Sequence, residues 1–136
     1  MLLEKAWAKI HKSYERIESG FAENVLRDLT GAPTKVIFHD DPELWDSMWD
    51  AHNKGFLIAA SAGSTKASKK LLEEMGLIGN HSYGVLDIAI VKAFGDVDEK
   101  LIKLWNPWGD FEWTGDWSDQ SANWTSEIKK QLNYTE

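Results

Sequence analysis

Residues 81–106 read HSYGVLDIAIVKAFGDVDEKLIKLWN, and this stretch decides the fold class. Its first half has a period of two, which places alternate side chains on opposite faces of a β-strand. One face carries His81, Tyr83 and Val85, and the other carries Leu86, Ile88 and Ile90. Gly95-Asp96 signals a turn, and Leu101 to Asn106 has the character of a second strand. The stretch therefore predicts two consecutive strands.

Helical patterns dominate the residues before this stretch. Apolar residues recur every three or four positions over about residues 2–18, which predicts an amphipathic helix. Further helices are predicted over 23–29, over 41–55 after the typical start Asp41-Pro42, from Ser64-Thr65 to Met75, and over 125–134. Short strands are predicted over 35–38 and 56–60. A helix-rich first part followed by a strand-rich second part predicts an α+β fold.

The length and the first residues suggest a part of a larger protein. The 136 residues suffice for one compact domain or subdomain. No Ser, Thr, Asp or Asn precedes the first predicted helix to cap it, so the chain is expected to begin in mid-helix. We expect that the chain is a piece of something longer.

The composition limits the chemistry that the chain can perform. Fifteen Lys and Arg residues oppose 22 Asp and Glu residues, which gives a formal net charge of −7. This balance argues against nucleic-acid binding, because phosphate contacts need clustered cations. The absence of cysteine excludes disulfides, zinc–thiolate sites and a cysteine nucleophile within the chain. No apolar run approaches the roughly 18 residues of a membrane span.

His81 and Asn106 are the candidate catalytic pair. An Asn carbonyl that accepts from one imidazole N–H fixes the ring's tautomer and leaves the other nitrogen to handle a proton. Trp108, two residues further on, is placed to cover that bond from water, which strengthens it. Such a pair needs a nucleophile to serve. The alternative is a structural histidine at the start of a strand.

The position of the turn decides whether this pair can form. His81 and Asn106 face each other in a hairpin only if its midpoint falls near residues 93–94. A tight turn at 96–97 would instead place Asn106 opposite Asp87, roughly 20 Å from His81 at about 3.3 Å per residue. The pair therefore requires a wide loop over about 90–98 or a β-bulge such as Gly84 could host.

Several motifs give the chain a resemblance to a known family. The stretches NHSYGV (80–85) and LIKLWNPWGDFEWTGDWSD (101–119) resemble the His and Asn motifs of calpains. LLEKAWAK (2–9) with SYE (13–15) resembles the calpain segment that links the two halves of the protease core, and DLTG (28–31) fits the next landmark. The match is collinear over essentially the whole chain. One departure is Asn80, because calpains usually have Gly immediately before the His.

The resemblance implies a function and a set of partners. Calpains are intracellular, calcium-dependent cysteine endopeptidases with a papain-like cleft between two subdomains, which implies a cytoplasmic protein that cleaves protein substrates. The chain would be the second subdomain, an antiparallel sheet or partial barrel flanked by helices, and a Cys-bearing subdomain of the same parent would be its partner. His81 would be the general base and acid, Asn106 would orient it, and Trp108 would shield their bond. The chain alone is then expected to be inactive.

The acidic stretch 96–119 raises the question of calcium. It holds seven carboxylates against two lysines, and a solvated acidic loop is the simplest interpretation. The spacing is not that of an EF-hand. The resemblance implies instead a non-EF-hand Ca²⁺ site to which Glu112 and Asp119 contribute. The acidic stretch that should supply its other ligands is absent, so weak calcium binding or none is expected for this chain.

Two other functions remain open from the sequence. A non-catalytic calpain-like module would keep the fold for protein binding. A tryptophan-rich sugar-binding domain would use some of the five indoles between residues 105 and 124 for stacking on sugar rings, although Trp is more often a core or interface residue. If the chain is half of a two-subdomain core, it should also expose an apolar surface where its partner binds.

Overall fold

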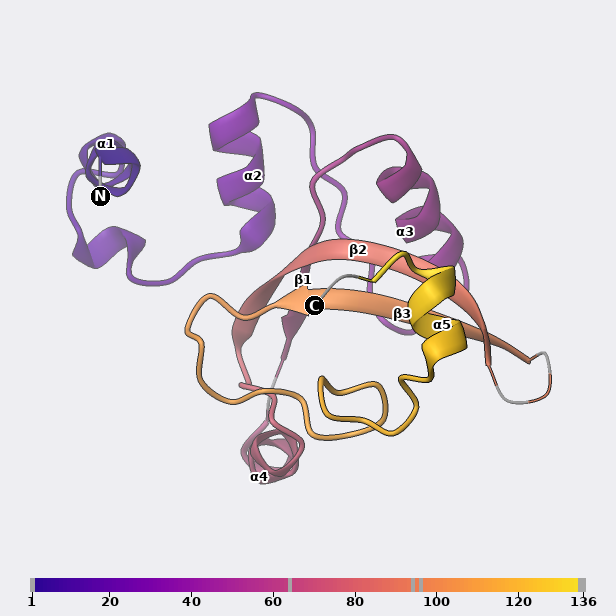
Figure 1. Ribbon diagram of the computed structural model, residues 1–136. Helices are drawn as coiled ribbons and strands as arrows, with labels where there is room; N and C mark the ends of the chain where they lie inside the picture. Colours follow the sequence, from indigo (N-terminus) through magenta and orange to yellow (C-terminus); the bar gives the residue numbers. More distant parts are fainter. Residues whose placement is uncertain (1, 64, 94, 96, 135–136) are drawn as a thin grey trace. The chain divides into compact units, whose positions relative to one another are not determined.

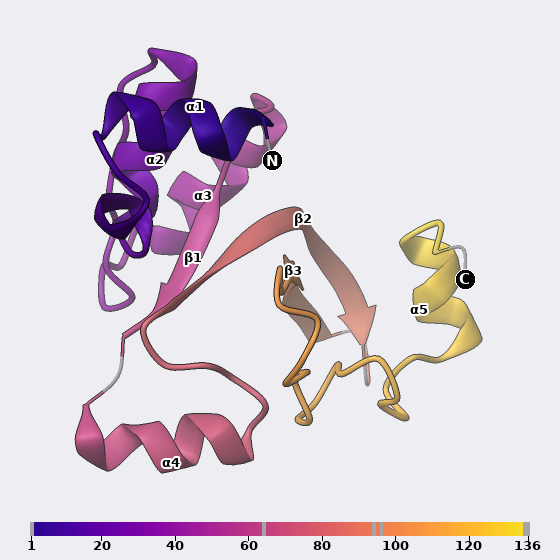
Figure 2. The same cartoon turned by 90° about the vertical axis from the view of Figure 1, so that its left-hand side faces the viewer.

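The computed structural model describes residues 2–63, 65–93, 95 and 97–134. The chain divides into two compact units, Met1–Asp41 and Pro42–Glu136 (Figures 1 and 2). The first unit is helical, and the second holds an antiparallel sheet with helices. The predicted α+β class is confirmed.

The first unit contains three helical elements. They are α1 (Leu2–Ile10), the 3₁₀-helix η1 (Glu15–Ile17) and α2 (Ala22–Thr30). The prediction of one helix over 2–18 is wrong beyond Ile10. Lys12 has a φ of +80°, and a right-handed helix cannot continue through a left-handed residue.

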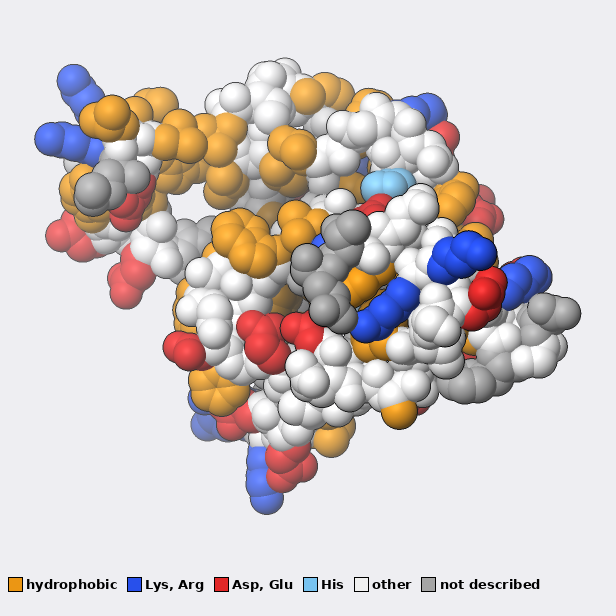
Figure 3. Space-filling model, viewed as in Figure 1, with side chains coloured by type: hydrophobic (Ala, Val, Ile, Leu, Met, Phe, Trp, Pro, Cys, Tyr) orange, Lys and Arg blue, Asp and Glu red, His pale blue; other side chains and the backbone are white. Residues whose placement is uncertain are grey.

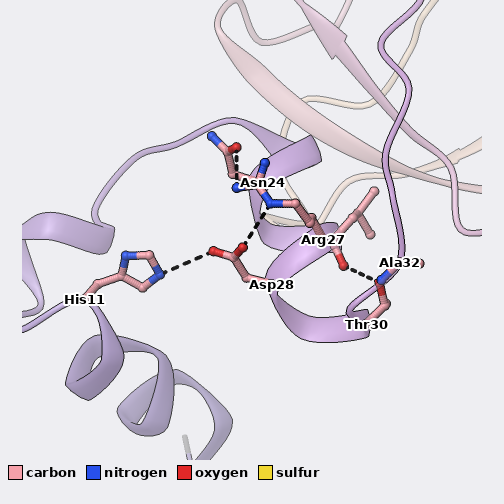
Figure 4. Close-up of polar contacts among 7 residues, drawn as sticks. His11, Asn24, Arg27, Asp28, Thr30 and Ala32 are labelled. Atoms are coloured by element: carbon pink, nitrogen blue, oxygen red, sulfur yellow. Dashed lines mark hydrogen bonds and ion pairs between the residues drawn. The ribbon is translucent and has the colours of Figure 1, made fainter.

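Polar side chains of α2 and of the segment that follows α1 lie near one another (Figure 4). His11 Nε2 lies 3.8 Å from Asp28 Oδ2, and Arg27 Nε donates to Asp28 Oδ1. Helix α2 ends at Gly31, whose φ of +70° gives the left-handed cap that glycine favours.

The predicted strand at 35–38 is absent, and Val36 is 53% exposed. A β-favouring segment forms a strand only when another strand pairs with it.

The second unit is built on a three-stranded sheet. Its strands β1 (Ala59–Ala62), β2 (His81–Ala93) and β3 (Val97–Trp105) lie in the order β1-β2-β3, and both pairs are antiparallel. The sheet is open rather than barrel-like. Compared with the prediction, β1 lies three residues later and β3 begins four residues earlier.

The β2–β3 hairpin does not have the register that a tight turn at 96–97 would give. Ala93 pairs with Val97, so the centre of the hairpin falls at Gly95, and the predicted turn residue Asp96 lies outside the described residues. A one-residue irregularity interrupts the ladder between Val85 and Asp87, where Leu86 is the extra residue of a β-bulge.

Helices cover both faces of this sheet. Leu101 of β3 packs against the cluster around α5 (Ser126–Gln131), whereas the neighbouring Lys100 lies over the ring of Trp45 in α3 (Leu44–Asn53). Consecutive strand residues point to opposite faces, so α5 and α3 lie on opposite sides. Helix α3 begins at Leu44, three residues after the predicted start.

A small core joins α5 to the second half of β2, where Figures 1 and 2 show them side by side. Val91, Ala93 and Ile128 are its buried members. Partly buried side chains pack around them: Leu101, Trp117, Trp124 and Leu132. The Gln131 side chain adds two hydrogen bonds to the backbone of Lys92, as a neighbouring strand would.

Helix α4 (Lys66–Glu74) is bounded as the sequence predicts. Thr65 caps it by accepting from the Ser68 N–H, while Ser64, the other predicted capping residue, lies outside the described residues. Gly76 follows the helix with a φ of +78°, and a Cβ there would collide with the carbonyl oxygen of Glu112. The end of α4 is thereby packed against the loop after β3.

None of the helices in the described part of the chain is long and apolar enough to span a membrane.

Candidate functional site

The ends of β2 and β3 bring two predicted site residues together. His81 is the first residue of β2, and Asn106 directly follows Trp105, the last residue of β3. His81 Nε2 lies 3.2 Å from Asn106 Oδ1, which is within hydrogen-bond distance. The structure therefore contains the predicted contact between imidazole and carboxamide.

The bulge at Leu86 makes this contact possible. Gly84 pairs with Trp105, so continuing the ladder by one residue places Asn106 opposite Tyr83, on the same face as His81. On the other side of the bulge, Asp87 pairs with Lys103. If that register continued without the extra residue, Asn106 would lie opposite Gly84. A shift of one residue turns a side chain to the other face of the sheet. The pair therefore depends on a bulge, as the sequence suggested, but the bulge lies at Leu86 rather than Gly84.

Backbone groups fix the orientation of the Asn106 amide. Its side chain is buried, and its Oδ1 accepts from the Trp108 N–H at 3.1 Å. Its Nδ2 donates to the carbonyl oxygens of Asp110 and Phe111. The oxygen therefore faces the imidazole, and an amide oxygen only accepts, so His81 Nε2 is the nitrogen that carries the proton. In the neutral ring, Nδ1 carries no proton and can accept a proton.

Two aromatic rings enclose the imidazole. The ring of Trp108 lies 4.5 Å from that of His81, centroid to centroid, and that of Tyr83 meets it edge-on at 4.9 Å. Tyr83 is buried, and its hydroxyl accepts from the Ile78 N–H at 2.8 Å, which fixes the ring. Sequence reasoning gave Tyr83 no role, although the period-two pattern already placed it on the face of His81.

The residue before His81 has an unusual backbone conformation. Asn80 has a φ of +57°, a region that favours glycine but that Asn adopts more readily than most residues. Its N–H donates to the carbonyl oxygen of Ala62, the last residue of β1. This explains how Asn80 can occupy a position where the resemblance leads us to expect Gly.

Comparisons with known proteins place the sequence in a family. The sequence profile described as "Calpain family cysteine protease" matches residues 1–136. Human Calpain-14 is 41% identical over 125 residues, which cover 90% of this chain and 18% of that protein. Rat Calpain-9 is 36% identical over 140 residues, 98% of this chain and 20% of that protein. A calpain-type cysteine protease of Oryza sativa subsp. japonica is 34% identical over 143 residues, 98% of this chain and 6% of that protein.

The chain belongs to the calpain family of cysteine proteases. This membership fits the papain-like α+β fold expected from the sequence motifs. The chain spans only 6% to 20% of the length of these three calpain relatives.

The acidic residues expected to bind calcium do not form a complete site. Glu112 and Asp119 are both exposed on the loop after β3. In the described residues, no group of three or more His, Asp or Glu side chains is placed to hold a metal ion. Because Ca²⁺ takes roughly six to eight oxygen ligands, the side chains grouped in the described part of the chain do not by themselves make up such a set.

The tryptophans after residue 104 serve different purposes. Trp117 and Trp124 meet edge-on and pack against the core, and Trp124 Nε1 donates to the carbonyl oxygen of Ser118. Trp113 Nε1 donates to the carbonyl oxygen of Asp116. The ring of Trp108 contacts the imidazole at a tilt of 52°. Trp117 and Trp124 are thus packing residues of the core, whereas Trp105 and Trp108 are exposed.

Proposed function

We propose that this chain supplies the histidine and asparagine of a calpain-type cysteine endopeptidase core, and that a subdomain bearing the cysteine completes the site. The contact between His81 Nε2 and Asn106 Oδ1, 3.2 Å long, carries the proposal. It gives an imidazole of defined tautomer whose Nδ1 is available to a thiol.

His81 is the general base and acid of this mechanism. Its Nδ1 takes the proton of the partner's thiol, and the thiolate attacks the carbonyl carbon of the scissile peptide bond. The carbon–nitrogen bond then breaks, and the imidazolium gives its proton to the leaving amine. In the second half, the imidazole deprotonates the water that attacks the thioester. The carbon–sulfur bond then breaks, and the imidazolium returns the proton to the leaving thiolate.

Asn106 and Trp108 support the imidazole. Asn106 holds the ring in one orientation through Nε2 and is itself held by the backbone of residues 108–111. Trp108 covers one side of the ring. A bond with less competition from water is stronger, so the indole stabilises the orientation that catalysis needs.

Exposed apolar residues beside the pair support a partner subdomain. Trp105 and Trp108 flank Asn106 and are 58% and 64% exposed. Figure 3 shows further hydrophobic side chains at the surface of the face drawn. Contiguous exposed apolar surface often marks a contact with another domain or a ligand. Protein substrates, a cytoplasmic location and calcium binding completed by ligands outside this chain are parts of the same proposal.

Kinetics of the intact protease that contains this chain test the proposal. We expect His81→Ala to lower kcat/KM for a peptide substrate by at least about 10²-fold, because the general base is lost. His39→Ala removes an exposed histidine and is the matched control, which should retain full activity. The 136-residue chain alone should not hydrolyse the peptide. Full activity of His81→Ala would instead favour a non-catalytic module.

A further inference from the structure

The register that brings Asn106 to the face of His81 depends on the bulge at Leu86, so the groups that hold this bulge are of interest. On the β1 side of β2, strand pairing ends at Gly84. From the bulge onward, no described strand supports that edge of β2. A bulge leaves backbone groups out of the regular ladder, and these groups need other partners.

At the bulge itself, the Val85 N–H still donates to the carbonyl oxygen of Ile58, just before β1. Beyond Val85, a carboxylate provides a further contact. Asp87 follows the bulge, and its Oδ1 accepts from the Ile88 N–H at 2.9 Å. The same oxygen lies 3.2 Å from Nε2 of His52, on α3. One side chain thus connects the backbone after the bulge with the helix that packs on β2.

We propose that Asp87, anchored by His52, is a positioning residue for the pair of His81 and Asn106. This inference rests on the proposed function, and Asp87 touches neither member of the pair. It acts through the register: the bond to Ile88 and the contact with α3 favour the ladder in which Leu86 is the extra residue.

The competing arrangement differs from the observed one only locally. All pairs from Asp87 to the end of the hairpin remain, and only residues 81–86 slip by one position against residues 104–106. In that arrangement Leu86 faces Leu104, and Asn106 turns to the face opposite His81. Asp87 joins two groups, the Ile88 N–H and the His52 imidazole, and these contacts favour the observed register over the slipped one.

A global stability measurement would not reveal this role. The side chains of His52 and Asp87 are 33% and 59% exposed, and exposed ion pairs contribute little to the free energy of unfolding. The readout must therefore report on the register and on the surroundings of the imidazole.

Nuclear Overhauser contacts in the 136-residue chain provide this readout. A contact between Val85 and Leu104 reports the bulged register, and one between Leu86 and Leu104 reports the slipped register. A contact between the rings of His81 and Trp108 reports the site. We expect Asp87→Ala to lose the first and third contacts and to gain the second.

Matched variants separate the hydrogen bond from a general effect of substitution. Asp87→Asn keeps an oxygen that can accept from Ile88 and should retain the wild-type contacts. Asp50→Ala removes another exposed carboxylate of the same unit, which pairs only locally with Lys54, and should also leave them unchanged. Wild-type contacts in Asp87→Ala, or their complete loss in Asp87→Asn, would overturn the proposal.

His52→Ala decides the question if Asp87→Ala does not fold. It leaves the bond between Asp87 and Ile88 in place, so a weakened contact between Val85 and Leu104 supports the proposal and an unchanged one overturns it. These contacts do not involve proteolysis. An intact protease that proved inactive would refute the proposed function without changing their outcome.

Discussion

His81 and Asn106 form their hydrogen bond diagonally across the hairpin, not as directly opposed residues. The last pair of the ladder is Gly84 with Trp105, and extending it by one residue places Asn106 opposite Tyr83, two positions from His81. The 3.2 Å contact crosses this offset. The burial of Asn106 and its four hydrogen-bond contacts define the orientation of the imidazole. Loss of this side chain should therefore affect catalysis more than its single bond to the ring suggests.

In the intact protease, we expect Asn106→Ala to lower kcat/KM by about 10²-fold, because a small misplacement of a reacting group has effects of that size. Asn53→Ala is the matched control, since Asn53 is exposed and its side chain bonds only to the backbone of its own helix, at Trp49. Equal activity of the two variants would show that the carboxamide does not orient the ring.

The sequence alone predicted the two long strands and the identity of the pair. Period-two alternation identified β2, which begins with His81. The motifs around Asn106 identified that residue as the partner of His81. The bulge position was not predictable, because Val85 and Leu86 are both apolar and either could be the extra residue. The absence of the predicted strand at 35–38 and the early end of α1 have different causes, and neither shows in the local sequence. A strand depends on a neighbour distant in sequence, and the positive φ of Lys12 has no signal such as Gly.

Gly76 should be essential for the packing of α4 against the loop that carries Glu112. An added Cβ would lie 1.8 Å from the Glu112 carbonyl oxygen, at a residue with a φ of +78°. We expect Gly76→Ala to lower the free energy of unfolding by at least about 3 kcal/mol, since backbone strain and overpacking add. Urea unfolding followed by tryptophan fluorescence measures this change.

Gly55→Ala is the control that separates strain from collision. Gly55 has a φ of +71°, but an added Cβ there would meet nothing within 4 Å. We expect a loss of about 1 kcal/mol, from backbone strain alone. Similar losses in the two variants would contradict the close packing of the loop on Gly76.

Calcium should not bind tightly to this chain alone. Glu112 and Asp119 are exposed, and the described residues contain no group of three or more His, Asp or Glu side chains placed to hold a metal ion. Titration calorimetry with CaCl₂ should detect no micromolar binding, and Glu112→Gln should leave the trace unchanged. Micromolar affinity that disappears in Glu112→Gln would show that the chain holds a complete site.

The most direct test of the account is the ¹⁵N spectrum of the His81 imidazole, recorded in the 136-residue chain above the pH at which the ring becomes neutral. We predict a protonated Nε2 and an unprotonated Nδ1. The Nε2 proton should exchange slowly with water in the wild type, and its exchange should be fast in Asn106→Ala. A proton located mainly on Nδ1, or identical spectra for the wild type and Asn106→Ala, would contradict the claim that the carboxamide prepares this histidine for a thiol.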